Sequence, residues 1–216
     1  GVFAAPEYTG SDELEYLPFP SIDVTYKDFF FASVVDGVGF NVIRKESWGA
    51  AFSGQIVMGR ENEGNIEPLD PIDDRFLPQL EIFTDSGPTR LHGSVIGDGK
   101  RFSGEVGLQY LRQASDRSVY MIGGGARWNN AAWNDERFSI TASEATRIGI
   151  EPYSAGASVS EGYIQGAYVY YLSPVYALEV VVEIAELIGD SGDSPLAEEL
   201  GSTTQPSMFF RINRQL

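Results

Sequence analysis

The side chains whose types and spacing could do chemistry are one histidine, one pair of glutamates and two groups of aspartates. His92 is the only histidine of the chain, and Ser94 follows two residues later. On a strand the two side chains share a face, and a base beside a hydroxyl suits nucleophilic catalysis when a nearby Asn orients the base. The next Asn along the chain is Asn129. We therefore interpret His92 as an ordinary polar strand residue.

Glu179 and Glu183 stand four residues apart in SPVYALEVVVEIAEL, residues 173–187. As a strand, this stretch places both carboxylates on one face, whereas a helix would gather Glu179, Glu183 and Glu186 on one side. The three consecutive valines favour the strand. Two carboxylates about 7 Å apart on one strand face have a separation that glycosidases can use. Because nothing in the sequence indicates a substrate cleft, we interpret both glutamates as lining a polar interior.

Two acidic segments offer oxygen ligands for a metal ion. They are DPIDDRF, with Asp70, Asp73 and Asp74, and GDSGDS, with Asp190 and Asp193. Carboxylates separated by Gly and Ser suit Ca²⁺, but neither segment has the spacing of an EF-hand loop. The glycines of GGGARW have no phosphate-binding spacing and are expected to relieve crowding on a strand. The sequence thus predicts solvated acidic loops, with no metal site, no cofactor and no catalytic residue.

The composition limits the class of protein. The chain has 216 residues without an obvious linker or repeat, so we expect one domain over residues 1–216. A formal charge of −16 would repel DNA or RNA, and the absence of cysteine excludes disulfides and thiolate chemistry. No apolar run reaches about 18 residues, so no transmembrane helix is expected. A chain that starts at Gly1 is expected to be a mature or trimmed product.

Short segments of alternating polarity recur along the chain and predict an all-β protein. We expect about twelve strands, or about ten, joined mainly by tight hairpins into an antiparallel up-and-down meander. The expected strands are residues 2–9, 17–27, 29–43, 48–59, 77–86, 89–97, 102–113, 118–129, 154–160, 162–172, 175–187 and 205–214. The expected tight turns are 27–28, 97–100, 160–162 and 173–174.

Two architectures fit this alternation. A soluble sandwich or barrel buries the apolar faces, whereas a transmembrane β-barrel turns them to lipid and its ionic faces to a polar lumen. About twelve strands of about ten residues suit a transmembrane barrel of this length. Tyrosines near the expected strand ends, such as Tyr26 and Tyr176, suit the aromatic girdles of a membrane protein. The charged residues predicted to line the lumen and pair there are Lys27, Glu105, Arg127, Glu179, Glu183 and Arg211.

The expected strand count also predicts how the loops divide between the two ends of the barrel. With a periplasmic N-terminus, loops 60–76 and 130–153 fall on the periplasmic side, and 10–16 and 188–204 fall outside. Long periplasmic loops would offer surfaces for docking partners.

Several segments of the chain occur in an order that a known family shares. The first is the opening stretch APEYTGSDELEYLPFPSIDVTYKDFFF. The shared residues are Pro6, Tyr8, Gly10, Ser11, Asp12, Pro18 and Pro20, followed by GVGFNVI (37–43), Gly59-Arg60, Tyr120-Met121 and GDSGDSPL (189–196). In this order the chain is similar to the MipA/OmpV family of outer-membrane proteins. It departs from the family where Tyr120-Met121 continues as IGGGARW rather than Tyr-Phe-Gly. It also departs where the chain continues past Phe210 as RINRQL, since outer-membrane barrels usually finish on an aromatic residue.

The resemblance implies a scaffold in the outer membrane of a Gram-negative bacterium, surrounded by outer-membrane lipid. Family members are described as bringing a lytic murein transglycosylase together with a murein synthase, which implies two periplasmic partners and no reaction of the chain itself. Some relatives are described as adhesins or osmotically linked porins, so a small porin or adhesin is the alternative. A soluble, acidic β-barrel binding protein is a third possibility.

Overall fold

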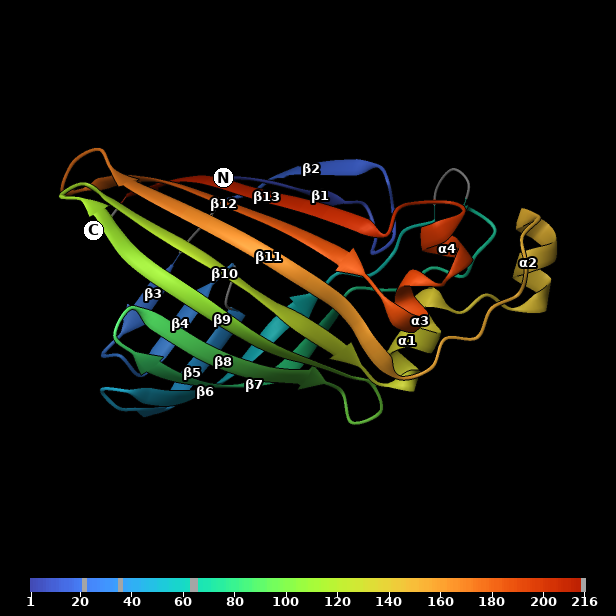
Figure 1. Ribbon diagram of the computed structural model, residues 1–216, viewed down its shortest axis with the longest axis horizontal. Coiled ribbons are helices and arrows are strands. Elements are labelled where there is room, and N and C mark those ends of the chain that lie inside the picture. Colours follow the sequence, from blue (N-terminus) through green and yellow to red (C-terminus); the bar gives the residue numbers. More distant parts are fainter. Residues whose placement is uncertain (21–22, 35–36, 63–65, 215–216) are drawn as a thin grey trace.

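The computed structural model describes residues 1–20, 23–34, 37–62 and 66–214. Within this part of the chain, 13 strands form one antiparallel sheet (Figure 1). The strands are β1 Val2–Pro6, β2 Leu14–Pro18, β3 Val24–Tyr26, β4 Phe30–Ser33, β5 Gly37–Arg44, β6 Trp48–Val57, β7 Arg75–Ser86, β8 Thr89–Gly97, β9 Phe102–Ser115, β10 Ser118–Asn129, β11 Ser158–Tyr171, β12 Tyr176–Leu187 and β13 Thr204–Arg214. The predicted all-β class and the strand over residues 176–187 are therefore confirmed.

The strands follow one another around the sheet almost in chain order. The order is β2-β1-β13-β12-β11-β10-β9-β8-β7-β6-β5-β4-β3, so β1 joins the last strand and β2 and β3 are the two edges. Every neighbouring pair is antiparallel, and an odd number of strands therefore leaves β2 and β3 running in the same direction.

The described residues form 13 strands where about twelve, or about ten, were expected, and the differences are local. The expected strand 17–27 appears as β2 and β3, and 29–43 divides into β4 and β5, with Gly37 at φ 73° where β5 begins. Residues 21–22 and 35–36 of these expected strands lie outside the described residues. The expected strands 154–160 and 162–172 are one strand, β11, and the predicted turn at 160–162 does not form.

A bulge explains why β11 looked interrupted. Its pairing with β10 shifts register so that Arg127 stands opposite Glu161 and Trp128 opposite Val159, leaving Ser160 as an extra residue. Such a bulge bends a strand without ending it.

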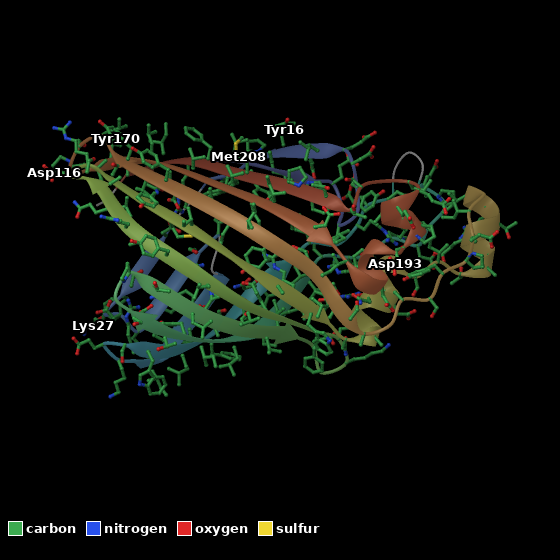
Figure 2. All side chains as sticks on the ribbon, in the orientation of Figure 1. Tyr16, Lys27, Asp116, Tyr170, Asp193 and Met208 are labelled. Carbon is green, nitrogen blue, oxygen red and sulfur yellow. The ribbon has the colours of Figure 1, made fainter. Side chains whose placement is uncertain are left out.

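The two faces of the sheet differ in side-chain character, as Figure 2 shows for Tyr16 and Met208, which point outward. The outer face is apolar, and the exposed fractions of Ile122, Ile164 and Ile212 are 56%, 65% and 61%. The inner face carries charged and small side chains together with some apolar ones, such as Phe3, Val181 and Phe209. On β12 it includes Ala177 and Ala185, which are each 3% exposed.

The sheet curves until its distant strands face one another. Asp23, ahead of β3 at one edge of the sheet, pairs with Arg211 of β13 near the other edge. A cavity of about 940 Å³ is lined by residues of β3 and β4 together with residues of β11, β12 and β13. The inner face thus encloses space, although no hydrogen-bonded ladder joins β2 to β3 among the residues that the structure describes.

Four helices gather at one end of the sheet (Figure 1): α1 Ala131–Phe138, α2 Ala142–Ile148, α3 Gly189–Gly192 and α4 Pro195–Glu198. We call the described parts of residues 58–74, 130–157 and 188–203 the helical cap. Its core joins loops that follow β6, β10 and β12, through Ile66, Ile140 and Leu196. No helix in the described ranges has the length and apolarity needed to cross a membrane.

Local sequence signals explain the two longer helices. Asn130 is the N-cap of α1, where its side chain accepts a hydrogen bond from the Trp133 N–H at 3.0 Å. Thr141 and Glu144 form a capping box at the start of α2, and Gly149 ends that helix at φ 89°.

The predicted division of the loops between two ends was wrong. Loop 10–16 lies beside loop 188–204, because the Ser202 N–H donates to the Gly10 carbonyl at 2.8 Å. Loop 188–204 in turn packs with 60–76 and 130–153 in the cap. The connections that the structure describes at the opposite end of the sheet are tight, and Figure 2 places Lys27 and Asp116 there, far from Asp193 of the cap.

Candidate functional site

Arg127 on β10 is the centre of a charged network on the inner face, which we call the Arg127 network. Its Nε donates to Glu105 of β9 at 2.8 Å, and its Nη1 donates to Glu161 of β11. Nη1 and Nη2 also donate to Glu183 of β12, at 3.0 and 3.1 Å. One guanidinium therefore links four consecutive strands and holds three carboxylates.

Tyr163 and His92 complete this network from opposite sides. The Arg127 guanidinium carbon lies 4.3 Å from the centroid of the Tyr163 ring, and the Tyr163 hydroxyl donates to Glu105 at 2.9 Å. His92 Nε2 lies 3.4 Å from the same carboxylate and makes no hydrogen bond, although it is inaccessible to solvent.

Two glycines make the room that Tyr163 occupies. Gly107 and Gly125 stand opposite each other on β9 and β10. A Cβ at Gly107 would lie 2.2 Å from His92 Nε2, and a Cβ at either glycine would lie within 2.7 Å of the Tyr163 hydroxyl. The glycines therefore relieve crowding on the inner face.

Arg211 on β13 forms a second, separate network. Its Nε donates to Glu179, the directly opposed residue of β12, at 2.6 Å, and its Nη1 donates to Asp23 ahead of β3. Asn213 also donates to Glu179, at 3.1 Å. Glu179 and Glu183 thus share a strand face as predicted but are held by different arginines.

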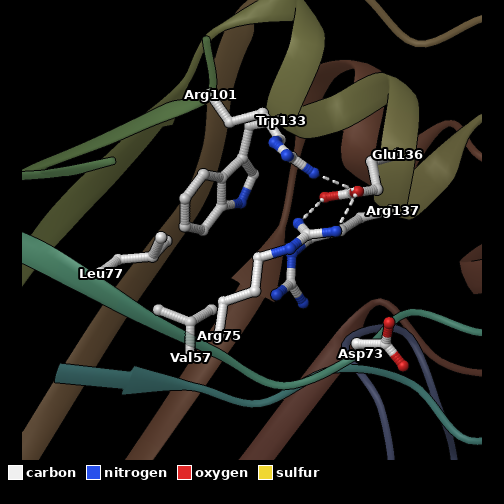
Figure 3. A pocket seen from close by; sticks show the side chains of 8 residues that line it. All are labelled: Val57, Asp73, Arg75, Leu77, Arg101, Trp133, Glu136 and Arg137. Atoms are coloured by element: carbon white, nitrogen blue, oxygen red, sulfur yellow. Dashed lines mark hydrogen bonds and ion pairs between the residues drawn. The ribbon is translucent and has the colours of Figure 1, made fainter. Parts of the chain in front are cut away.

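A third network joins the sheet to the cap (Figure 3). Arg75, the first residue of β7, donates to both oxygens of Glu136 on α1, at 2.5 and 2.6 Å, and Arg101 donates to the same carboxylate. The hydrogen bonds from Arg75 lower the pKa of Glu136 below its ordinary value, although partial burial opposes this shift.

A buried amide fixes the cap from inside. Asn134 of α1 is 0% exposed, and its Nδ2 donates to the Gly156 carbonyl at 2.7 Å and to Ser158 at 3.1 Å. Its Oδ1 accepts from Asn129 of β10 at 2.9 Å, and it also accepts from Ser160 and Ser191. This single side chain connects α1, α3 and two wall strands.

The structure brings five of the six predicted charged residues into these networks. Lys27 is the exception, because it lies in the turn between β3 and β4, where its Nζ is 5.1 Å from the Tyr26 ring centroid. His92 faces Glu105, and no hydrogen bond joins it to Ser94 among the described residues. Glu179 and Glu183, the pair whose spacing a glycosidase could use, are each bound to an arginine.

Aspartates of the two acidic segments, 70–76 and 189–194, accept hydrogen bonds from the backbone of other loops. Asp74 accepts from the Gly59 N–H at 2.7 Å, and Asp190 accepts from the Gly156 N–H. Across the described residues, no group of three or more His, Asp or Glu is arranged to hold a metal ion.

Sequence reasoning missed several participants. Glu161 was not predicted to face the interior, because a turn was expected at 160–162. Asp23 lay within the expected strand 17–27, but its pairing with Arg211 was not predicted. The contact of the Tyr163 ring with Arg127 has no signal in the sequence. Arg75, Arg101 and Glu136 come together only through the cap, which the sequence did not predict.

A family model described as MltA-interacting protein MipA matches residues 1–216. The chain belongs to the MipA family. This confirms the resemblance of the opening stretch, and the match extends over all three charged networks and the cap of this MipA family member. A comparison with curated proteins finds no match.

Proposed function

We propose that this chain is an outer-membrane β-barrel that acts as a scaffold in murein metabolism and catalyses no reaction itself. It would bring a lytic transglycosylase together with a murein synthase. The observation that carries the proposal is the MipA family match along the whole chain, whose description names an interaction with MltA.

The direction of the edge strands supports a closed wall. β2 and β3 are consecutive in the chain and run the same way, so they can act as two halves of one strand, paired with β1 at one end and β4 at the other. Counted in this way the wall has an even number of strands, as bacterial single-chain barrels have.

The outward side chains support a lipid environment. Ile122, Ile164 and Ile212 are more than half exposed, whereas the interior holds ion pairs. In water this arrangement would leave a large apolar area hydrated, at roughly 25 cal/mol per Å². In a membrane the same face meets acyl chains.

The unequal ends of the sheet suggest an orientation. Outer-membrane barrels have short periplasmic turns and longer extracellular loops. By this rule the cap faces outward, and the periplasmic enzymes meet the tight-turn end, where Lys45, Glu46, Asp116 and Arg117 are exposed.

Single cysteines can test this orientation, because the chain has none of its own. Asp116→Cys lies in a tight turn, and Ser143→Cys lies on α2. A membrane-impermeant maleimide applied to intact cells is expected to label Ser143→Cys and to label Asp116→Cys only after lysis. The reverse pattern would place the cap in the periplasm and move the docking surface there.

The scaffold role is tested by capture of both enzymes on the detergent-extracted protein. We expect a lytic transglycosylase and a murein synthase to be retained together. Reversing the charges of the tight-turn end with Lys45→Glu and Arg117→Glu should weaken retention, and Arg147→Glu on the cap is the matched control. Failure to retain either enzyme would exclude the scaffold role.

A small porin is a second candidate, favoured by the cavity of about 940 Å³ inside the sheet. Against it, the Arg127 network lies on the inner face of the sheet, and an ion pair between Arg101 and Glu136 anchors the cap at one end of the sheet. Planar-bilayer recording separates the two roles, because a scaffold is expected to show no steady conductance.

A further inference from the structure

Arg137 differs from the arginines of the three networks because no carboxylate pairs with it among the described residues. Its Nη2 donates to the Met58 carbonyl at 2.8 Å, and its guanidinium carbon lies 5.3 Å from the Trp133 ring centroid. The neighbouring Glu136 is engaged by Arg75 and Arg101, and Figure 3 draws no ion pair to Arg137.

The surroundings of Arg137 make its charge costly. The pKa of Arg137 is lowered to about 10, mainly by burial; Glu136 opposes this shift, and the positive charges of Arg60 and Arg75 add to it. A guanidinium normally titrates above about 12 and needs partners when it leaves water. An added anion would supply the missing partner.

Arg137 also borders enclosed space. A chamber of about 250 Å³ lies between the cap and the Arg127 network, lined by Arg137, Trp133 and Glu161, with the hydroxyls of Ser103 and Ser160. Phe138, Val57 and Leu187 add apolar walls. The charged side chains of the lining are two arginines, Arg127 and Arg137, and one carboxylate, Glu161, which Arg127 binds.

The chamber is adjacent to other cavities of the interior. It shares Met58, Arg137 and Glu161 with a second cavity of about 230 Å³. That cavity shares Phe3, Leu17 and Glu183 with the cavity of about 940 Å³ nearer the tight-turn end. The three cavities are therefore neighbours, and Arg137 lines the two that lie nearer the cap.

We propose that the chamber is a binding site for a small organic anion, in which the Arg137 guanidinium pairs with a carboxylate or phosphate group and Trp133 contacts the apolar body. A planar guanidinium with free donors can bind either oxyanion through two parallel hydrogen bonds. The volume of 250 Å³ corresponds to roughly eight water molecules at about 30 Å³ each, which suits an anion with a single ring. This site is independent of the scaffold role and would be occupied from inside the wall.

Trp133 provides the measurement. Trp48 and Trp128 are exposed, at 44% and 45%, so Trp48→Phe and Trp128→Phe together leave Trp133 as the only tryptophan. Benzoate, phenyl phosphate and neutral benzyl alcohol are titrated against the detergent-extracted full chain. We expect a saturable change in fluorescence with benzoate or phenyl phosphate, and binding of benzyl alcohol at least tenfold weaker.

Variants of Arg137 test whether its guanidinium binds the anion. Arg137→Gln should weaken anion binding at least tenfold, Arg137→Lys should weaken it less because the charge remains, and Arg147→Gln on exposed α2 should leave it unchanged. Equal binding of the alcohol and the anions, or no saturable change with either anion, would overturn the site without any variant. Unchanged binding in folded Arg137→Gln would also overturn it. Capture of the two murein enzymes is measured separately, so failure of one proposal leaves the other testable.

Discussion

Arg127 Nη1 lies 3.0 Å from Glu183 Oε1, although β11 separates the strands that carry these residues. The contact crosses the concave side of the sheet rather than following the hydrogen-bond ladder. It requires the long arginine side chain to pass over the ring of Tyr163, which stands on the intervening strand. The charge network and the curvature of the wall therefore depend on each other.

Removal of Arg127 should be the most damaging single change on the inner face. Arg127→Gln leaves Glu105, Glu161 and Glu183 without their shared cation. Breaking a buried ion pair costs about 3–5 kcal/mol, and partial solvent access at this site reduces our expectation to about 2 kcal/mol or more. Urea unfolding of the detergent-extracted protein measures the loss, with Arg147→Gln as the control. Equal unfolding midpoints for the two variants would contradict the central role of Arg127.

The space that Gly107 leaves for Tyr163 predicts different effects for two glycine-to-valine substitutions. Gly107→Val places methyl groups against His92 and the Tyr163 hydroxyl and should destabilise the fold by about 2 kcal/mol through overpacking. Gly162→Val, on β11 where a Cβ would meet nothing within 4 Å, should be neutral. Thermal unfolding compares the two. Tyr163→Ala should partly restore the stability of Gly107→Val. Lack of such a rescue would contradict the claim that Gly107 makes room for Tyr163.

Asn134 should control the integrity of the cap. Asn134→Ala removes all of its hydrogen bonds and leaves Asn129 and the Gly156 carbonyl without this partner. The expected cost exceeds about 2 kcal/mol. Because the effect is local to the cap, limited proteolysis should cut residues 131–157 faster while the wall strands stay protected. Ser143→Ala, at an exposed position of α2, is the control, and equal cleavage of both variants would contradict the prediction.

The third network predicts a pH dependence of cap docking. Since the pKa of Glu136 is lowered in the folded protein, its contribution is fully present above the unfolded value of about 4.3 and is lost as the pH falls through the lowered value. Trp133 fluorescence in the variant with no other tryptophan should therefore report cap opening below about pH 4. Glu136→Gln should open more readily at neutral pH and show a flatter response. An identical acid response in both proteins would exclude Glu136 as the titrating group.

The alternation of polar and apolar residues predicted the strands of the wall better than the helices of the cap. Alternation at period two identified β12 and placed Glu179 and Glu183 on one face, because that pattern depends only on neighbouring residues. The partners of those glutamates come from other strands, and a register shift at Ser160 decides that Glu161 reaches Arg127. Such register is set by the assembled sheet, so the strand break expected at 160–162 could not be corrected from the sequence.

The cap escaped prediction for a different reason. Its helices are short, and α2 is recognised only by the Thr141 capping box and the terminal Gly149. Their apolar residues meet partners from three separate loops, so no single segment carries an amphipathic pattern long enough to predict a helix.

The shared core of the cap also has a consequence for assembly. Ile66, Ile140 and Leu196 follow β6, β10 and β12, so they meet only after those hairpins have taken their places in the sheet. Contacts of such long sequence separation form late, because the entropy of closing the intervening chain must be lost first. A protected cap therefore marks molecules in which β6, β10 and β12 have come together, and its protease resistance measures the fraction of such molecules in a mixed population.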